Sequence, residues 1–178
     1  MRAIGLIAVL LLSACASSHG PSYVGRTYSA SGAIPLECGP YARALTGMQL
    51  RGDAASWWDQ AAVHYRRTDH PTVGSVLVFE DTSRLPHGHV AVVSRILSDR
   101  QILVTQANWV HREVTEDQPV VDISPSNTWS TVRVWWPPTA SMGVTDYPTF
   151  GFINPDRPAT HDQLLAASAR AADVATSR

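Results

Sequence analysis

The spacing of apolar residues changes once along this chain, and that change restricts the fold more than any other feature. Residues 36–45 and 54–66 place apolar side chains at helical intervals, and Gly47 and Asp53 stand where a helix would end and begin. From residue 74 onward the apolar runs are short, β-branched and bounded by turn residues, as in strands. Helices followed by strands predict an α+β domain in which N-terminal helices pack on an antiparallel sheet.

The strand candidates are short and regularly spaced. They are residues 74–79, 89–97, 101–106, 120–123 and 131–136. The second and third flank Ser98, Asp99 and Arg100 and are expected to pair as a hairpin. The aromatic segment 147–155 is irregular and is expected to pack back on the domain.

The chain divides into four expected segments. A signal peptide covers residues 1–14, a lipid-anchored tether residues 15–33, one folded domain residues 34–156 and a flexible tail residues 157–178. The tail is rich in Ala, Ser and Arg. Leu164 would allow a weak helix there, but a frayed tail is the prediction.

The first residues have the layout of an export signal. Arg2 precedes the apolar run 3–12, which is shorter than the roughly 20 residues that span a bilayer. Residues 12–15 read Leu-Ser-Ala-Cys, which resembles the lipobox of bacterial lipoproteins, so Cys15 is the expected lipidation site. An ordinary secretory peptide cut near Ala14 or Ala16 is the alternative.

In bacterial lipoproteins the modified cysteine carries three acyl chains. Stable anchoring takes two or more, so lipid attachment at Cys15 would hold the protein at a membrane. Ala16 is not a retention signal for the inner membrane in lipoproteins, so the resemblance implies the periplasmic face of the outer membrane. Acylation would also leave Cys38 as the one free thiol. The 14 basic and 15 acidic residues nearly cancel, which indicates no nucleic acid partner, and we expect a monomer.

Cys38 and His89 are the candidates for chemistry. Cys38 lies at the expected start of a helix, where unpaired N–H groups and the helix dipole favour a thiolate. A buried, inert cysteine is the alternative. His89 begins an expected strand, and a cysteine and a histidine distant in sequence but joined in space form a nucleophile and its base. Taken alone, His89 could equally be a surface histidine.

A base of this kind usually needs a third group that orients its ring. If the hairpin pairs His89 near Asn108, the side chains of Gln106 and Asn108 point to the same face as His89. A slip of one residue would turn both amides away. His87 and His89 could instead bind a metal, but no further ligand motif accompanies them, so neither metal nor other cofactor is predicted.

Five motifs occur in the order found in CHAP domains, over about residues 34–136. They are Glu37-Cys38-x-x-Tyr41-Ala42-Arg43, Gly52-Asp53-Ala54-x-x-Trp57-Trp58-x-x-Ala61, Pro71-x-x-Gly74-Ser75-Val76-Leu77-Val78-Phe79, Gly88-His89-Val90-Ala91-Val92-Val93 and Asn108-Trp109. The chain therefore resembles the cysteine- and histidine-dependent amidohydrolases/peptidases of the papain-like superfamily. Another papain-like family of cell-wall peptidases usually carries Asp-Cys-Ser in place of Glu-Cys-Gly-Pro and fits less well.

The resemblance implies a papain-like CHAP fold and a peptidoglycan hydrolase. Cys38 would be the nucleophile, and His89 the general base and later the acid. The bond would be the N-acetylmuramoyl-L-alanine amide or an amide within the peptides. Many members carry a carboxylate where this chain has Gln106, so either Asn108 orients His89, as an asparagine does in papain-like enzymes, or activity is reduced.

Three tryptophans are expected substrate contacts: Trp57, Trp58 and Trp109. Neighbours on a helix point about 100° apart, so at most one of the first two faces a groove fully. The alternative function is a catalytically silent lipoprotein that binds peptidoglycan and ties the membrane to the wall. The substitution at Gln106 favours it, and the presence of Cys38 and His89 disfavours it.

Overall fold

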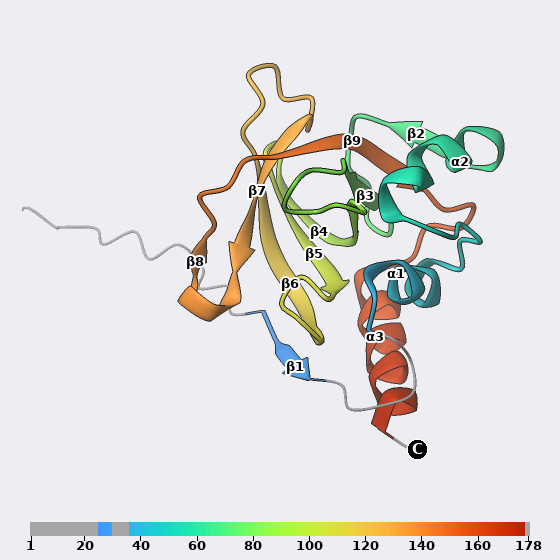
Figure 1. The fold of residues 1–178 in the computed structure, drawn as a ribbon. Helices are drawn as coiled ribbons and strands as arrows, with labels where there is room; N and C mark the ends of the chain where they lie inside the picture. The colour runs from blue at the N-terminus through green and yellow to red at the C-terminus, as the bar shows by residue number, and fades with distance from the viewer. Residues whose placement is uncertain (1–24, 30–35, 177–178) are drawn as a thin grey trace, which may run out of the picture.

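The computed structural model describes residues 25–29 and 36–176, and it has the predicted α+β composition (Figure 1). The predicted signal peptide and Cys15 lie outside the described residues. The helices are α1 Cys38–Thr46, α2 Trp57–His64 and α3 His161–Thr176, with 3₁₀ turns at Ala54–Ser56 and Pro137–Thr139. The strands are β1 Thr27–Ser29, β2 Arg66–Thr68, β3 Val76–Phe79, β4 His89–Ser98, β5 Gln101–Ala107, β6 Glu113–Asp122, β7 Thr131–Trp136, β8 Ser141–Met142 and β9 Tyr147–Asn154.

All strand pairings are antiparallel among these residues. The order is β1-β6-β5-β4-β3-β9-β7-β8, with β2 on β9, and β6 also pairs with β7. The six strands β3 to β7 and β9 therefore form a closed circuit of pairings. The predicted hairpin of β4 and β5 is present, with Val92 opposite Thr105.

The central strands are buried on both faces, and their alternation separates two apolar cores. In β3, Val76 and Val78 pack under the helices, whereas Leu77 and Phe79 point into the circuit of strands. Alternate side chains of a strand point to opposite faces, so one short run serves both cores. The sheet is therefore a rigid base for the helices above it.

Helix α1 forms where its spacing predicts and packs on β4 and β5. Tyr41, Ala42 and Leu45 bury one face of the helix. Gly47 ends it at φ 74°, and its N–H donates to the Arg43 carbonyl at 2.8 Å. Glycine adopts this left-handed conformation without the steric cost of a Cβ.

Two segments that were expected to be irregular or extended form strands instead. Residues 147–154 are not irregular but form β9, which lies between β3 and β7 and also pairs with β2. Pro148 and Gly151 interrupt the apolar pattern of residues 147–154, so the sequence did not indicate a strand there. Residues 27–29, which fall within the predicted tether of residues 15–33, instead pair with β6 as β1.

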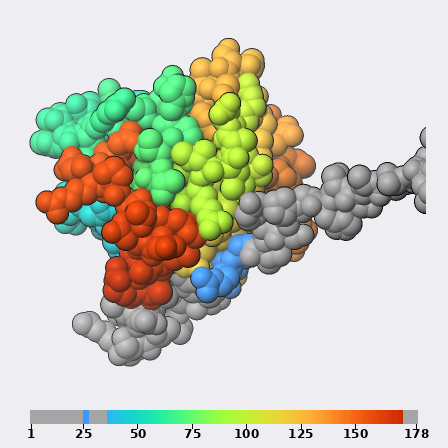
Figure 2. All heavy atoms as spheres, turned by 180° about the vertical axis from the view of Figure 1, so that it is seen from behind, coloured from blue at the N-terminus to red at the C-terminus, as the bar shows by residue number. Residues whose placement is uncertain are grey.

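The predicted flexible tail is also wrong, because residues 161–176 form α3. Leu164 and Ser168 are fully buried, and the Tyr41 hydroxyl lies 2.6 Å from that of Ser168. A narrow stripe of one large and several small residues thus suffices to dock the helix on α1. Seen from behind, α3 forms a continuous surface with the rest of the domain (Figure 2). No helix in the described ranges is long and apolar enough to cross a membrane.

Docking of α3 predicts a loss of stability in Leu164→Ala. Removing this fully buried side chain should lower the free energy of unfolding by about 2–5 kcal/mol. Urea unfolding measures the change, and Leu165→Ala, at a half-buried neighbour, is the matched control. Equal stability of the two variants would mean that the helix is not docked in solution.

Candidate active site

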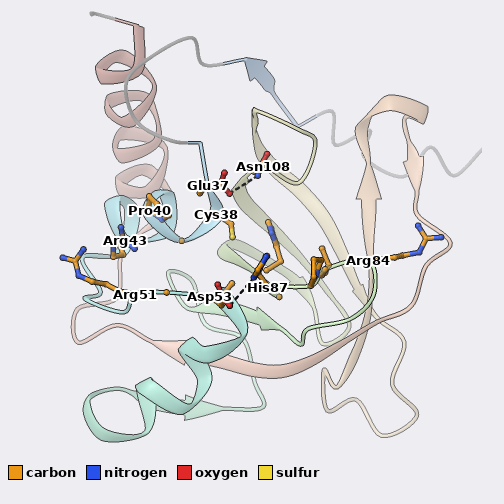
Figure 3. Close-up of a pocket in the computed structure, with 16 residues that line it drawn as sticks. Glu37, Cys38, Pro40, Arg43, Arg51, Asp53, Arg84, His87 and Asn108 are labelled. Carbon is orange, nitrogen blue, oxygen red and sulfur yellow. Dashed lines mark hydrogen bonds and ion pairs between the residues drawn. The ribbon is translucent and has the colours of Figure 1, made fainter.

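A cleft of about 610 Å³ opens at the N-terminus of α1 (Figure 3). Its walls are the start of α1, residues 51–54, residues 84–89 and Asn108. Volumes of this size are usual for small-ligand and substrate sites. The cleft therefore joins segments from α1, the loop before β4 and the end of β5.

Cys38 is the first residue of α1 and lines this cleft, and its thiol is half-buried. Burial raises the pKa of the thiol. The charge of His89, a hydrogen bond with its ring and backbone hydrogen bonds at Val90 and Gly39 lower the pKa, and together they outweigh burial. The net result is a pKa below the usual range of a thiol. A thiol of this kind is more nucleophilic near neutral pH than a buried structural cysteine.

His89 is held by one hydrogen bond and two aromatic rings. Its Nε2 lies 2.9 Å from Gln106 Oε1. An amide oxygen only accepts, so Nε2 carries the proton and Nδ1 keeps its lone pair for the thiol. Phe79 meets the ring edge-on at 5.5 Å between centroids, and Trp109 lies at 5.1 Å. With the residue only 4% exposed, the imidazole has a fixed orientation.

Asn108 lies near this pair but contacts Glu37 instead of His89. Its Nδ2 donates to Glu37 Oε2 at 3.1 Å, and its Oδ1 accepts from the Arg112 N–H at 2.9 Å. Strand β5 ends at Ala107, and Asn108 has φ 61°, so its side chain leaves the alternation that directs Gln106 to His89. Of the two predicted orienting amides, the structure brings Gln106 to the histidine.

Gly88 fixes the position at which β4 begins. It has φ 68°, and a Cβ there would lie 2.6 Å from the Ala55 nitrogen. The Ala55 N–H also donates to the His87 carbonyl at 3.1 Å. Only glycine permits this close approach in this conformation, so the 3₁₀ turn holds the residue next to His89.

The three tryptophans have different surroundings. Trp57 is 0% exposed and packs under Gly39, so its prediction as a substrate contact is wrong. Trp58 is half-buried, stacks on Phe150 at 5.9 Å, and is not part of the cleft wall. Trp109 lines an adjoining pocket of about 320 Å³, which shares Arg84 with the cleft.

The two histidines considered as a metal pair lie in different environments. His87 is largely exposed and its Nδ1 lies 3.2 Å from Asp53 Oδ2, whereas His89 is buried against Gln106. Across residues 25–29 and 36–176, no group of three or more His, Cys, Asp or Glu side chains is arranged to hold a metal ion.

No sequence pattern predicted that charged side chains would gather on the cleft wall. Arg51 and Arg84 line it together with Arg43, and Glu37 and Asp53 supply the acids. These residues lie in loops and at a helix start, where no periodic pattern marks a shared surface. The Arg51-Gly52-Asp53 turn before α2 was a usable signal, because charged loop residues next to a site are often functional.

Residues 27–108 match the family model of the CHAP domain, the family that the sequence motifs resemble. No curated protein matches the chain. Among solved structures, it resembles an N-acetylmuramoyl-L-alanine amidase from Staphylococcus aureus with 22% identity and a TM-score of 0.41, over 55% of this chain and 29% of that one. A second structure, Ly7917, matches at 11% identity and a TM-score of 0.35, over 73% and 90% of the two chains. The chain thus spans less than a third of the amidase.

The contact between Gln106 and His89 predicts how the reactivity of Cys38 responds to substitution. Gln106→Leu should slow alkylation by iodoacetamide at neutral pH by about tenfold, because a misoriented ring no longer lowers the thiol pKa. Gln106→Glu should keep or increase the rate, since a carboxylate accepts the same bond and stabilises imidazolium. Asn108→Ala is the matched control. A slow Asn108→Ala beside an unchanged Gln106→Leu would assign the orienting role to Asn108.

Proposed function

We propose that this chain is a cysteine amidohydrolase or peptidase that cuts an amide bond of peptidoglycan. The observation that carries the proposal is the low-pKa thiol of Cys38 beside the oriented ring of His89, within a chain that has a CHAP domain. A nucleophile, a base and a group that orients the base are the parts that covalent acyl transfer requires. The packing of α1 on β4 and β5 is consistent with a papain-like arrangement.

The first chemical step forms an acyl-enzyme. The Cys38 thiol gives its proton to Nδ1 of His89. The resulting thiolate attacks the carbonyl carbon of the amide, and a C–S bond forms as the carbonyl oxygen gains negative charge. The Cys38 N–H, which has no partner within the helix, is the proposed donor to that oxyanion; Pro40 has no N–H, and the Gly39 N–H already bonds the thiol. The C–N bond then breaks as His89 transfers its Nδ1 proton to the leaving nitrogen, while Nε2 keeps its proton on Gln106.

The second step releases the product. His89, now neutral, takes a proton from water as the water oxygen attacks the thioester carbon. The C–S bond breaks, the acyl group leaves as a carboxylic acid, and the proton on His89 again faces the thiolate. Gln106 holds the imidazole throughout, but as a neutral amide it stabilises imidazolium less than a carboxylate would, so we propose a slower enzyme than one with a carboxylate there.

Trp109 is the one tryptophan of the three that we retain as a substrate contact. Its ring lies against His89, and the pocket that it lines also contains Trp136 and Tyr147 and adjoins the cleft through Arg84. Aromatic faces beside a catalytic cleft suit an extended substrate with apolar faces and polar edges.

A catalytically silent peptidoglycan-binding lipoprotein is the second candidate. The neutral Gln106 favours it, because a binding protein has no need of a charged orienting residue. The lowered pKa of Cys38 favours the hydrolase, since a binding surface has no use for an activated thiol.

Digestion of purified peptidoglycan sacculi separates the two candidates. The protein should release soluble fragments, and Cys38→Ala should release none, because the acyl-enzyme cannot form. Mass spectrometry of the fragments identifies the bond: intact stem peptides freed from muramic acid indicate an amidase, and shortened or separated peptides indicate an endopeptidase. Arg95→Gln, on β4 outside the cleft, is the control. Equal release by the protein and Cys38→Ala would reject the hydrolase.

We also propose that Cys15 is lipidated and holds the protein at the periplasmic face of an outer membrane as a monomer. The proposed anchor rests on the Leu-Ser-Ala-Cys sequence at residues 12–15. Cys15→Ser expressed in a Gram-negative host should move from the membrane fraction to the soluble periplasmic fraction, because no acyl chain is attached. A variant that remains with the membranes at the level of the parent protein would contradict the anchor.

A further inference from the structure

Two arginines lie on the same flank of the catalytic cleft. Arg43 and Arg51 both line it, and Figure 3 shows both on the same side of Cys38 as Pro40. Arg43 comes from α1, and its Nη1 lies 3.9 Å from the position that a Cβ would take on Gly39. Its guanidinium is therefore held against the helical turn that carries Cys38.

The backbone between these arginines is fixed by hydrogen bonds. Arg43 Nη1 donates to the Leu50 carbonyl at 3.3 Å, so it reaches the residue before Arg51. The Arg51 N–H donates to Gln60 Oε1 at 3.3 Å, and the Arg51 carbonyl accepts from Gln60 Nε2 at 2.7 Å. The base of the Arg51 side chain is thus anchored, while the residue itself is exposed.

The acidic residues of the cleft do not neutralise this flank. Glu37 accepts from Asn108 at 3.1 Å, and Asp53 lies 3.2 Å from His87. In the described part of the chain, neither Arg43 nor Arg51 forms an ion pair. The whole protein has a formal net charge of −1, so this positive flank is a local feature rather than a result of composition.

We infer that Arg43 and Arg51 form a subsite that binds a carboxylate of the substrate next to the scissile amide. Guanidinium groups present planar pairs of N–H donors that match the two oxygens of a carboxylate. The inference rests on the proposed function for its substrate, the peptide part of peptidoglycan. It specifies the class further: stem peptides with free carboxylates rather than with carboxamides.

Arg84 does not belong to this subsite. It lies on the opposite side of Cys38 in Figure 3, and it lines the aromatic pocket of Trp109. The cleft is therefore asymmetric, with two arginines on one flank and a single arginine beside aromatic rings on the other.

The test measures binding separately from catalysis. In the full chain with Cys38→Ala, calorimetry compares a soluble stem peptide that has free carboxylates with the same peptide converted to carboxamides. The free peptide should bind about tenfold more tightly, and added salt should reduce the difference. Arg51→Gln, added to Cys38→Ala, should abolish the preference. Arg95→Gln removes the same charge from an exposed site outside the cleft and should preserve it.

Each outcome of this test has a defined meaning. Equal affinity for the two peptides, no binding of either, or equal effects of Arg51→Gln and Arg95→Gln would overturn the subsite. Failure of the hydrolase proposal has a different signature, because the wild-type protein would then release nothing from sacculi whichever peptide it binds. A preference for free carboxylates without hydrolysis would keep the subsite and reject the enzyme.

Discussion

The packing of α1 across β4 and β5 is the contact on which the rest of the site depends. Tyr41, Ala42 and Leu45 share a core with Val90 and Val92 of β4. That contact sets the first residue of the helix, Cys38, over the beginning of the strand that carries His89. The apolar burial of one helix face thus brings together two groups that are 51 positions apart in the sequence, and the low thiol pKa follows from their proximity.

Segments from both ends of the described chain hold this helix in place. The Tyr41 hydroxyl lies 2.6 Å from that of Ser168 on α3, and Ser168 donates to Glu116 of β6. Glu116 is also 3.3 Å from Arg26, which directly precedes β1. Glu116 is nearly fully buried, and a buried carboxylate is tolerated only with partners of this kind. A polar network therefore links β1, α3 and β6 to the turn after Cys38.

Sequence reasoning succeeded where a local pattern determines the outcome. Apolar spacing predicted α1 and the hairpin of β4 and β5, and motif order predicted the family whose model matches residues 27–108. It failed where the outcome depends on packing between distant segments. In α3, the stripe of small residues buries apolar surface only when α1 lies against it. Helical geometry predicts that Trp57 and Trp58 point in different directions. The packing of Trp57 against Gly39 of α1 decides that Trp57 is the buried one, and the spacing does not encode that contact.

The choice between Gln106 and Asn108 shows the same limit at atomic scale. The register with Val92 opposite Thr105, continued along the hairpin, leads to His89 opposite Asn108, so both amides were reasonable candidates. The positive φ of Asn108 decides between them, and alternation along a strand does not encode it.

A neutral orienting residue also fits its surroundings. Gln106 is 1% exposed and its Nε2 has no hydrogen-bond partner among the described residues, so the contact of its Oε1 with His89 is what the side chain contributes here. A carboxylate there would depend on a protonated His89 to offset its desolvation, and it would destabilise the fold whenever that proton was lost. An amide stabilises imidazolium less than a carboxylate does. It also leaves the buried pair of Gln106 and His89 without a charge when His89 is neutral.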